Sequence, residues 1–219
     1  MNYDTQNEFA FLNFALETGV LRFGEFTLKS GRVSPYFFNA GLFNSGKTLG
    51  RLADFYADAL NHREHDPFML FGPAYKGIPL AAATAASLFH RHDRDVPYAF
   101  NRKEVKDHGE GGQLVGAPLS GDIVIIDDVI TAGTSARESV DLIQQSGANP
   151  VAVMIALDRE EVVNDTGESA IQSVTREFGL RVHALARFQT LLAFLESHPT
   201  LSDFLPALEA YRRDYGTSE

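Results

Sequence analysis

The segment from Asp122 to Ser135 constrains this chain more than any other stretch. Ile123 to Ile126 form a run of β-branched apolar residues, which is typical of a strand buried on both faces. The run ends at Asp127 and Asp128, so two carboxylates lie at the carboxyl end of the predicted strand. Ligands bind at this edge of an open α/β sheet. The segment therefore predicts an α/β fold with a polar site where its central strand ends.

A turn of small residues, Thr131 to Ser135, follows the two acids. Ser135 and Glu138 have the spacing of a capping box for a following helix. Free amides, hydroxyls and a helix N-terminus favour an anion such as phosphate. A phosphate beside two acids indicates a two-part ligand, with a phosphate for the turn and a pair of hydroxyls, as on a ribose, for the acids. The alternative is an ordinary strand, turn and capped helix whose acids only solubilise the loop.

The composition limits the class of protein. The 219 residues are 44% hydrophobic and 22% charged, which suits one globular domain with a small appendage. The net charge of −10 disfavours nucleic acid and anionic membrane surfaces, because both are polyanions. The absence of cysteine suits a cytoplasmic protein, and scattered histidines give no metal-ligand pattern. We expect neither a signal peptide nor a membrane span.

The N-terminal part, approximately residues 1–45, predicts a small hood over the main sheet. Residues 6–18 have helical periodicity, and residues 23–28 and 36–39 have the composition of two strands. The turn between them, Lys29 to Arg32, carries two cations.

Residues 41–48 match the G-x-x-x-x-G-K-T pattern of a P-loop, with the strand ending at Asp127 as its possible partner. However, Leu42 and Phe43 add bulk where such a loop wraps a phosphate, and Pro35 is unusual in a central strand. A simple helix start at Gly46 is the better interpretation.

Two further strands are expected to end in basic loops. Residues 68–71 precede a loop, residues 72–77, that contains Lys76, and a helix is predicted over 78–90. A lysine at a helix N-terminus opposes the helix dipole, and a bound polyanion would remove that conflict; an exposed surface lysine is the alternative. Residues 96–100 predict a strand before a Gly-rich loop, residues 102–114, with a cluster of cations. A loop of this kind is typical of a lid ordered by its ligand, although a solvated surface loop remains possible.

Residues 150–157 predict another buried strand, which places Arg159 at the same edge as the acids. A guanidinium there can grip a carboxylate of a ligand. Pairing with the neighbouring Glu160 or Glu161 is equally compatible with the spacing. The remaining chain predicts a helix, a strand and two helices over residues 169–178, 181–186, 188–196 and 203–213.

Five motifs together resemble the bacterial orotate phosphoribosyltransferases of the type I phosphoribosyltransferase family. They comprise residues 26–32, 34–44, 72–77, 102–112 and the segment through Ser135, and the likeness covers nearly the whole chain. The last motif resembles the phosphoribosyl pyrophosphate (PRPP) signature that many such enzymes share. The Tyr-Phe-Phe-Asn and Arg-Lys-Glu-Val-Lys-Asp-His segments are the ones that single out orotate.

The resemblance implies a fold, an activity and partners. The expected fold is a central parallel sheet flanked by helices, with a hood over approximately residues 1–45, a core over 46–219 and a mobile loop at 102–114. The expected reaction transfers a phosphoribosyl group from PRPP to orotate, with Mg²⁺ held mainly by PRPP or pyrophosphate and no dedicated protein metal site. The expected assembly is a homodimer with shared active sites.

The resemblance also implies a role for each site residue. The expected catalytic residues are Lys103, Lys106, His108, Asp127 and Asp128, with Lys103 supplied by the neighbouring subunit. The expected PRPP contacts are Lys29, Tyr75, Lys76, Arg102, Lys103, Lys106, His108, Asp127, Asp128, Val129, Ile130, Thr131, Ala132, Gly133, Thr134 and Ser135. The expected orotate contacts are Phe37, Phe38, Thr131 and Arg159.

Two other classes of function compete with this one. A P-loop hydrolase would split ATP or GTP and would depend on Lys47. A non-enzymatic PRPP sensor would need a nucleic-acid surface, and the acidic composition disfavours one.

Overall fold

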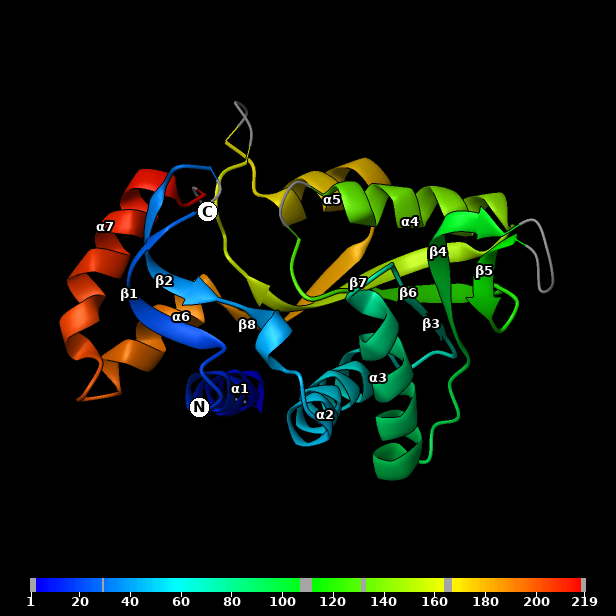
Figure 1. Cartoon of the computed structure of the whole chain (residues 1–219), viewed down its shortest axis with the longest axis horizontal. Helices are drawn as coiled ribbons and strands as arrows, with labels where there is room; N and C mark the ends of the chain where they lie inside the picture. Colours follow the sequence, from blue (N-terminus) through cyan, green and yellow to red (C-terminus); the bar gives the residue numbers. More distant parts are fainter. Residues whose placement is uncertain (1–2, 29, 107–111, 131–132, 164–166, 218–219) are drawn as a thin grey trace.

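The computed structural model describes residues 3–28, 30–106, 112–130, 133–163 and 167–217 (Figure 1). Lys29, His108, Thr131 and Ala132 lie outside these residues, as does the Lys106 side chain. The helices are α1 (Tyr3–Glu17), α2 (Gly46–Arg63), α3 (Gly77–His92), α4 (Thr134–Gln145), α5 (Ala170–Phe178), α6 (Phe188–Glu196) and α7 (Leu205–Tyr215), with short 3-10 turns at Ala40–Leu42 and Ser202–Phe204. Among these helices, none has the length and apolar character needed to cross a membrane.

A six-stranded sheet in the order β5-β4-β3-β6-β7-β8 forms the centre. Its strands are β3 (Met69–Gly72), β4 (Tyr98–Lys106), β5 (Gly112–Gly116), β6 (Asp122–Ile126), β7 (Asn149–Asp158) and β8 (Arg181–Arg187). Neighbouring strands run parallel except β5, which pairs antiparallel with β4 at one edge. The predicted parallel sheet with flanking helices is therefore confirmed.

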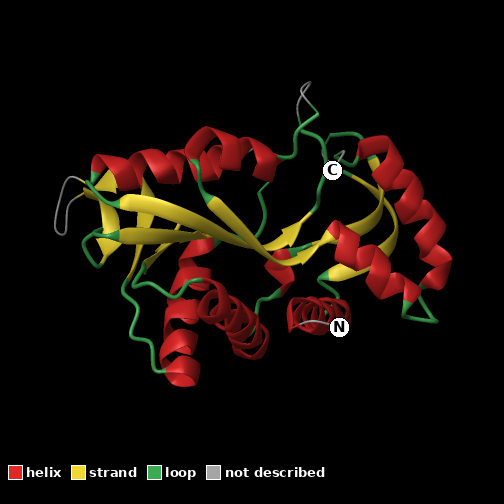
Figure 2. Cartoon of the chain, turned by 180° about the vertical axis from the view of Figure 1, so that it is seen from behind, coloured by secondary structure: helices red, strands yellow, loops and turns green. Residues whose placement is uncertain are grey.

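The sheet is buried on both faces because helices cover each side. Figures 1 and 2 show α4 and α5 on one side and α2 and α3 on the other. Successive side chains of a strand point to opposite faces, and β6 follows this rule. Val124 and Ile126 join the core on the α2 and α3 side, whereas Ile123 and Ile125 join the core on the α4 and α5 side. The unbroken apolar run recognised in the sequence is the consequence of this double burial.

The hood consists of α1 and a separate antiparallel pair, β1 (Leu21–Thr27) with β2 (Val33–Phe38). It packs against the C-terminal helices: the ring of Tyr36 lies 5.4 Å from that of Phe188 in α6 and 6.2 Å from that of Tyr211 in α7. The hood strands β1 and β2 and the C-terminal helices α6 and α7 thus gather at the β8 end of the sheet, whereas α1 lies beside α2 (Figure 1).

The P-loop interpretation of residues 41–48 is wrong. The strand before this segment is β2, which belongs to the small hood sheet and not to the central parallel sheet. Ser45 caps α2, because its Oγ accepts from the Thr48 amide at 3.2 Å and its amide donates to Thr48 Oγ1 at 3.1 Å. The hydroxyls that would serve a nucleotide therefore cap a helix.

The predicted loop over residues 102–114 is shorter in the structure. Residues 102–106 continue β4, and residues 112–114 begin β5, since Asn101 pairs with Leu114 and Lys106 with Gly112. The Gly-rich composition of this segment concealed its strand pairing.

Gly77 is predicted to be essential for packing where α3 meets the sheet. A Cβ at this position would lie 2.5 Å from Pro73 Cδ and 2.7 Å from the Ile126 carbonyl oxygen. We expect Gly77→Ala to lower the free energy of unfolding by about 2 kcal/mol or more. Gly50→Ala is the matched control, because a Cβ in this exposed part of α2 meets nothing within 4 Å; it should raise the same free energy by about 0.5–1 kcal/mol. Urea unfolding measures both, and equal stabilities of the two variants would contradict the prediction.

Candidate active site

Three loops meet at the carboxyl edge of the sheet. They follow β3, β6 and β7, and they contribute Lys76, the Asp127–Asp128 pair and Arg159. Figure 1 shows the chain leaving β6 and β7 on the side that faces the hood strand β2. This is the edge at which the sequence predicted the site.

The backbone of the acidic pair is held from two sides. The Asp127 amide donates to the Met154 carbonyl at 3.1 Å, and the Ala156 amide donates to the Asp128 carbonyl at 2.9 Å. From α2, the Tyr56 hydroxyl donates to the Asp127 carbonyl at 2.8 Å. Burial raises the pKa of Tyr56, and the neighbouring acids raise it further, so this hydroxyl remains a donor.

The Asp127 carboxylate is constrained within the site. Its Oδ1 accepts from the Asp128 amide at 2.9 Å, and its Oδ2 accepts from Ser135 Oγ at 3.2 Å. Burial, followed by the charge of Asp128, raises the pKa of Asp127 to about 6. Near neutral pH, Asp127 is therefore an ionised group in an environment that disfavours its charge, which suits an acceptor for the hydroxyls of a ligand.

Lys76, whose positive charge at a helix N-terminus is unfavourable, forms an ion pair with Asp128. It is the N-cap residue of α3, and its Nζ donates to Asp128 Oδ2 at 2.5 Å. The Lys76 side chain is 60% exposed, whereas that of Asp128 is 9% exposed. A carboxylate of the protein therefore faces this lysine. The bound polyanion that the sequence predicts stays a prediction, and such an anion would compete with Asp128 for the exposed lysine.

The start of α4 differs from the sequence prediction. Ser135 does not cap the helix: the N-cap is Gly133, which has a left-handed backbone (φ 74°) and makes no side-chain cap hydrogen bond. The predicted capping box of Ser135 and Glu138 is wrong because the Ser135 hydroxyl donates to Asp127 instead. The first helical hydrogen bond runs from the Arg137 amide to the Gly133 carbonyl, so the amides of Thr134 and Ser135 precede the hydrogen-bonded ladder. Such amides favour an anion.

Val129 and Ile130 carry the chain from the acids toward this turn. Val129 packs against the core beneath α2 and α3, and Ile130 packs against the core beneath α4 and α5. Their side chains anchor the loop, so any ligand contact from them would come from their backbone.

The described cations of β4 lie beside the loop that follows β3. Lys103 Nζ is 5.1 Å from the centre of the Tyr75 ring, and Tyr75 is 68% exposed. The Asn101 side chain accepts from the Ala74 amide at 2.8 Å and ties β4 to this loop. A cleft of about 270 Å³ lies here between Ala74, Lys103 and Ser135, and Arg102 precedes Lys103 in β4.

Phe37 and Phe38 do not present their rings to one side of the hood. Phe37 stacks on Phe26 at 5.5 Å, whereas Phe38 packs near Phe11 at 6.3 Å. Consecutive residues of a strand alternate in direction. A flat base would therefore stack on only one of these rings.

Arg159 pairs with Glu161, as one of the two sequence interpretations anticipated. Arg159 Nε donates to Glu161 Oε1 at 2.9 Å and to the Tyr36 hydroxyl at 3.1 Å. The Arg159 side chain is nevertheless 26% exposed at the carboxyl edge, so this pairing does not remove it from reach of a ligand.

The sequence pattern did not distinguish three residues that organise this site. Tyr56 has the spacing of a core residue in α2, and only its contact with Asp127 reveals a second role. Asn101 follows the predicted strand without any local motif. Glu161 was visible only as a possible partner of Arg159.

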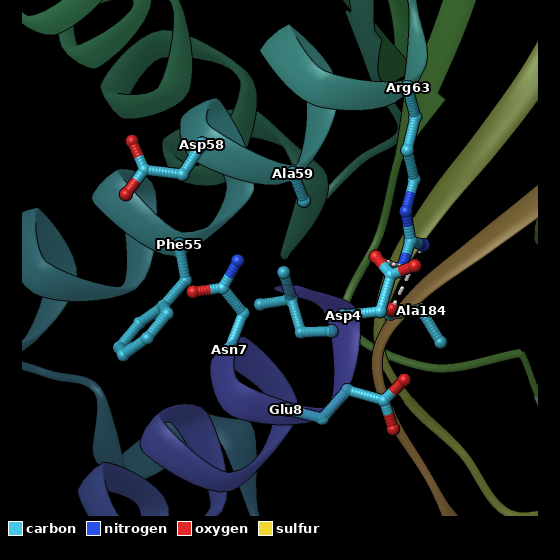
Figure 3. Close-up of a pocket in the computed structure, with 9 residues that line it drawn as sticks. Asp4, Asn7, Glu8, Phe55, Asp58, Ala59, Arg63 and Ala184 are labelled. Carbon is cyan, nitrogen blue, oxygen red and sulfur yellow. Dashed lines mark hydrogen bonds and ion pairs between the residues drawn. The ribbon is translucent and has the colours of Figure 1, made fainter. Parts of the chain in front are cut away.

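Another cavity lies between α1, α2 and β8, and its lining includes none of the site residues described above (Figure 3). Arg63 spans it, donating to Asp4 at 3.1 Å and to the Ala184 carbonyl at 3.3 Å. Its volume of about 20 Å³ suffices for roughly one water molecule. This cavity is a packing feature and not a substrate site.

Comparison with known proteins identifies the family. Residues 43–178 match the phosphoribosyl transferase domain. The chain is 61% identical over 207 residues to an orotate phosphoribosyltransferase of Thioalkalivibrio sulfidiphilus, a match covering 94% of this chain and 96% of that relative. The chain belongs to the orotate phosphoribosyltransferase family. The orotate phosphoribosyltransferase of Pseudomonas aeruginosa is 59% identical with the same coverage. The crystal structure of the orotate phosphoribosyltransferase of Francisella tularensis matches with a TM-score of 0.86 and 41% identity, covering 95% of this chain and 100% of that chain.

We expect the charge of Asp127 to lower the free energy of unfolding of this member of the orotate phosphoribosyltransferase family. The pKa of the Asp127 carboxyl is 3.8 in the unfolded reference and about 6 when folded, so the folded protein binds more protons between these values. The contribution of Asp127 to the free energy of unfolding therefore falls as the pH rises from 3.8 to about 6. We expect Asp127→Asn to raise the free energy of unfolding near neutral pH by about 1–3 kcal/mol. The amide oxygen can accept from the Asp128 amide as before, and Nδ2 can donate to the Ser135 hydroxyl, which then acts as the acceptor.

Urea unfolding of the wild type and of Asp127→Asn over this pH range measures the effect. The gain should shrink toward the acidic end, where Asp127 is neutral in both states. A variant that is less stable than the wild type near neutral pH, with an unchanged pH dependence, would contradict the assignment.

Proposed function

We propose that this chain transfers the 5-phosphoribosyl group of PRPP to N1 of orotate, giving orotidine 5′-monophosphate and pyrophosphate in the de novo synthesis of UMP. The observation that carries the proposal is the Asp127–Asp128 pair beside the α4 N-terminus, where Gly133 makes no side-chain cap. Carboxylates can take the ribose hydroxyls, and the uncapped amides can take the 5′-phosphate. The assignment of orotate as the base rests on the family to which the chain belongs.

The chemistry requires charge stabilisation at two places. Breaking the bond between C1 and pyrophosphate develops positive charge on the ribose, as in glycoside cleavage, and negative charge on the leaving group. Fixed cations must meet the leaving oxygens, and water must be kept from the sugar. Orotate is already an anion, so a strong general base is not required.

Each part of the site has a proposed role in this reaction. Asp127 and Asp128 hold the ribose, and the turn from Val129 to Ser135 holds the 5′-phosphate. The proposed orotate contacts are Arg159, Thr131, Phe37 and Phe38, with one of the two phenylalanine rings stacking on the base. The proposed contacts of the pyrophosphate are Lys29, Tyr75, Lys76, Arg102, Lys103, Lys106 and His108. In support of these contacts, Lys76 is exposed although paired with Asp128, so pyrophosphate can displace that partner.

Mg²⁺ is the proposed cofactor. It prefers oxygen ligands and commonly binds through one or two carboxylates together with the phosphates of a substrate. Asp127 and Asp128 fit this donor set at the edge of the site, although we expect PRPP oxygens to supply most ligands. When bound, the ion would neutralise charge on the leaving pyrophosphate.

The proposed assembly is a cytoplasmic homodimer with shared sites. β4, which carries Lys103, and its neighbour β5 lie at the opposite edge of the sheet from β8 and the hood (Figure 1). A strand pair at a sheet edge is well placed to contact a second subunit. Lys103 would then act at the neighbouring site as well as lying near its own Tyr75.

The substrate assignment predicts loss of orotate absorbance when PRPP and Mg²⁺ are present. Asp128→Asn should lower kcat/KM by about 100-fold or more, because it removes a charge at the sugar. Lys47→Ala is the control and should match the wild type, since the residues around it only begin α2. Turnover of hypoxanthine or uracil without turnover of orotate would contradict the assignment of orotate as the substrate. ATP hydrolysis that is lost in Lys47→Ala would instead support a P-loop hydrolase.

Sharing of the site predicts complementation between two inactive variants. Consider a hybrid dimer of one Lys103→Ala chain and one Asp128→Asn chain. The site on the Lys103→Ala chain keeps its own Asp128 and receives the intact Lys103 of its partner, whereas the other site lacks both groups. A one-to-one mixture of reassociated dimers should recover about a quarter of wild-type activity. If Lys103 served only its own subunit, every site would lack one group and no activity would return.

A further inference from the structure

One carboxylate oxygen beside the site gathers donors from three parts of the chain. Glu161 Oε1 accepts from Arg159 Nε at 2.9 Å, from the Tyr36 hydroxyl at 3.3 Å and from the Tyr211 hydroxyl at 3.1 Å. Arg159 Nη2 also lies 2.6 Å from this oxygen as an ion contact. The donors belong to the segment after β7, to hood strand β2 and to the C-terminal helix α7. Glu161 therefore joins elements that are distant in the sequence.

This cluster is buried more deeply than an ordinary surface ion pair. The Glu161 side chain is 13% exposed, and Tyr36 is 1% exposed. Burial raises the pKa of Tyr36 far above its ordinary value, and burial also raises the pKa of Tyr211. Both hydroxyls consequently stay protonated as donors. In such surroundings, a charge-assisted hydrogen bond controls orientation more strongly than it does at the surface.

The cluster also determines how Arg159 is presented. Glu161 occupies the Nε–Nη2 edge of the guanidinium, and the plane of that group lies over the Tyr36 ring, with Cζ 5.3 Å from its centre. Within the described residues, Nη2 makes no hydrogen bond, although it lies 2.6 Å from Glu161 Oε1 as an ion contact. The guanidinium therefore retains donor capacity for an acceptor from a ligand, and the Arg159 side chain is 26% exposed. A guanidinium held on one edge and one face has little freedom to rotate away.

The same contacts connect Arg159 to the other proposed contacts of the base. Tyr36 directly precedes Phe37 and Phe38 in β2, so its hydrogen bond to Glu161 ties that strand to the end of β7. Arg159 lies on the segment after β7, and both phenylalanines lie on hood strand β2, with their rings on opposite sides of that strand. Their separation depends on the carboxylate between them.

We propose that Glu161 is a positioning residue for the base: its carboxylate holds Arg159 and the Phe37–Phe38 strand at the spacing that a carboxylate-bearing pyrimidine requires. This inference rests on the proposed function and adds a residue to it. Glu161 itself repels an anionic base, so it acts through Arg159 and Tyr36. Its loss should weaken the binding of orotate while leaving the PRPP site, built on β6 and α4, unchanged.

Steady-state kinetics with Mg²⁺, varying orotate and PRPP in turn, test this proposal. Glu161→Gln should raise the KM for orotate by about tenfold, which corresponds to about 1.4 kcal/mol, and should leave the KM for PRPP within about twofold. Tyr36→Phe keeps the ring under Arg159 and removes only the hydroxyl; it should raise the orotate KM by about threefold. Glu168→Gln is the matched control, because the Glu168 carboxylate likewise accepts from an arginine, Arg176, at 2.8 and 3.2 Å, and both KM values should stay at wild-type levels.

The outcomes separate this inference from the proposed function. If the wild type does not consume orotate, the function itself fails. If the wild type does so and Glu161→Gln has an unchanged orotate KM, or the KM values for orotate and PRPP rise equally, the positioning role is wrong. If Glu161→Gln does not fold, Tyr36→Phe decides, and an unchanged orotate KM in that variant overturns the proposal.

Discussion

The structure depends on keeping two adjacent carboxylates at the end of a buried strand. Burial, followed by the charge of the neighbouring Asp128, disfavours ionisation of Asp127 and raises its pKa to about 6. Lys76 offsets part of the negative charge, and Ser135 and the Asp128 amide satisfy the oxygens of Asp127. These partners surround the pair without neutralising it completely. A site with excess negative charge and many oriented donors nearby is suited to a ligand that brings hydroxyls to the acids and phosphates to the donors.

The rest of the fold positions this pair. The double burial of β6 holds the strand rigidly, and the Tyr56 hydroxyl fixes the point at which the chain leaves it. Close contact of Gly77 with the Ile126 carbonyl brings the start of α3 beside the end of β6, so that Lys76 can reach Asp128. On the opposite side, Glu161 links the end of β7 to the hood. The candidate site is consequently supported from the sheet, from two helices and from the hood.

The sequence predicted the features that depend on residues close together in the chain. The Ile-rich run of β6 correctly predicted its burial on both faces. The lysine at the start of α3 predicted a bound polyanion, which stays a prediction, and the structure adds the contact of Lys76 with Asp128. Ser135 was misassigned as a cap because its spacing to Glu138 fits that motif, whereas its hydroxyl is used by Asp127, a partner across the turn. Tyr56, Asn101 and Glu161 act through contacts between elements far apart in the chain, and periodicity carries no information on such contacts. The opposite directions of Phe37 and Phe38 followed from strand alternation once their place in β2 was established.

A crystal structure of the protein with PRPP and Mg²⁺ tests the central claim most directly. The ribose hydroxyls should donate to Asp127 and Asp128, the 5′-phosphate should accept from the amides at the start of α4, and Lys76 should leave Asp128 for the pyrophosphate. A 5′-phosphate bound at the Ser45 turn before α2, or a ribose that does not touch the acidic pair, would contradict this description of the site.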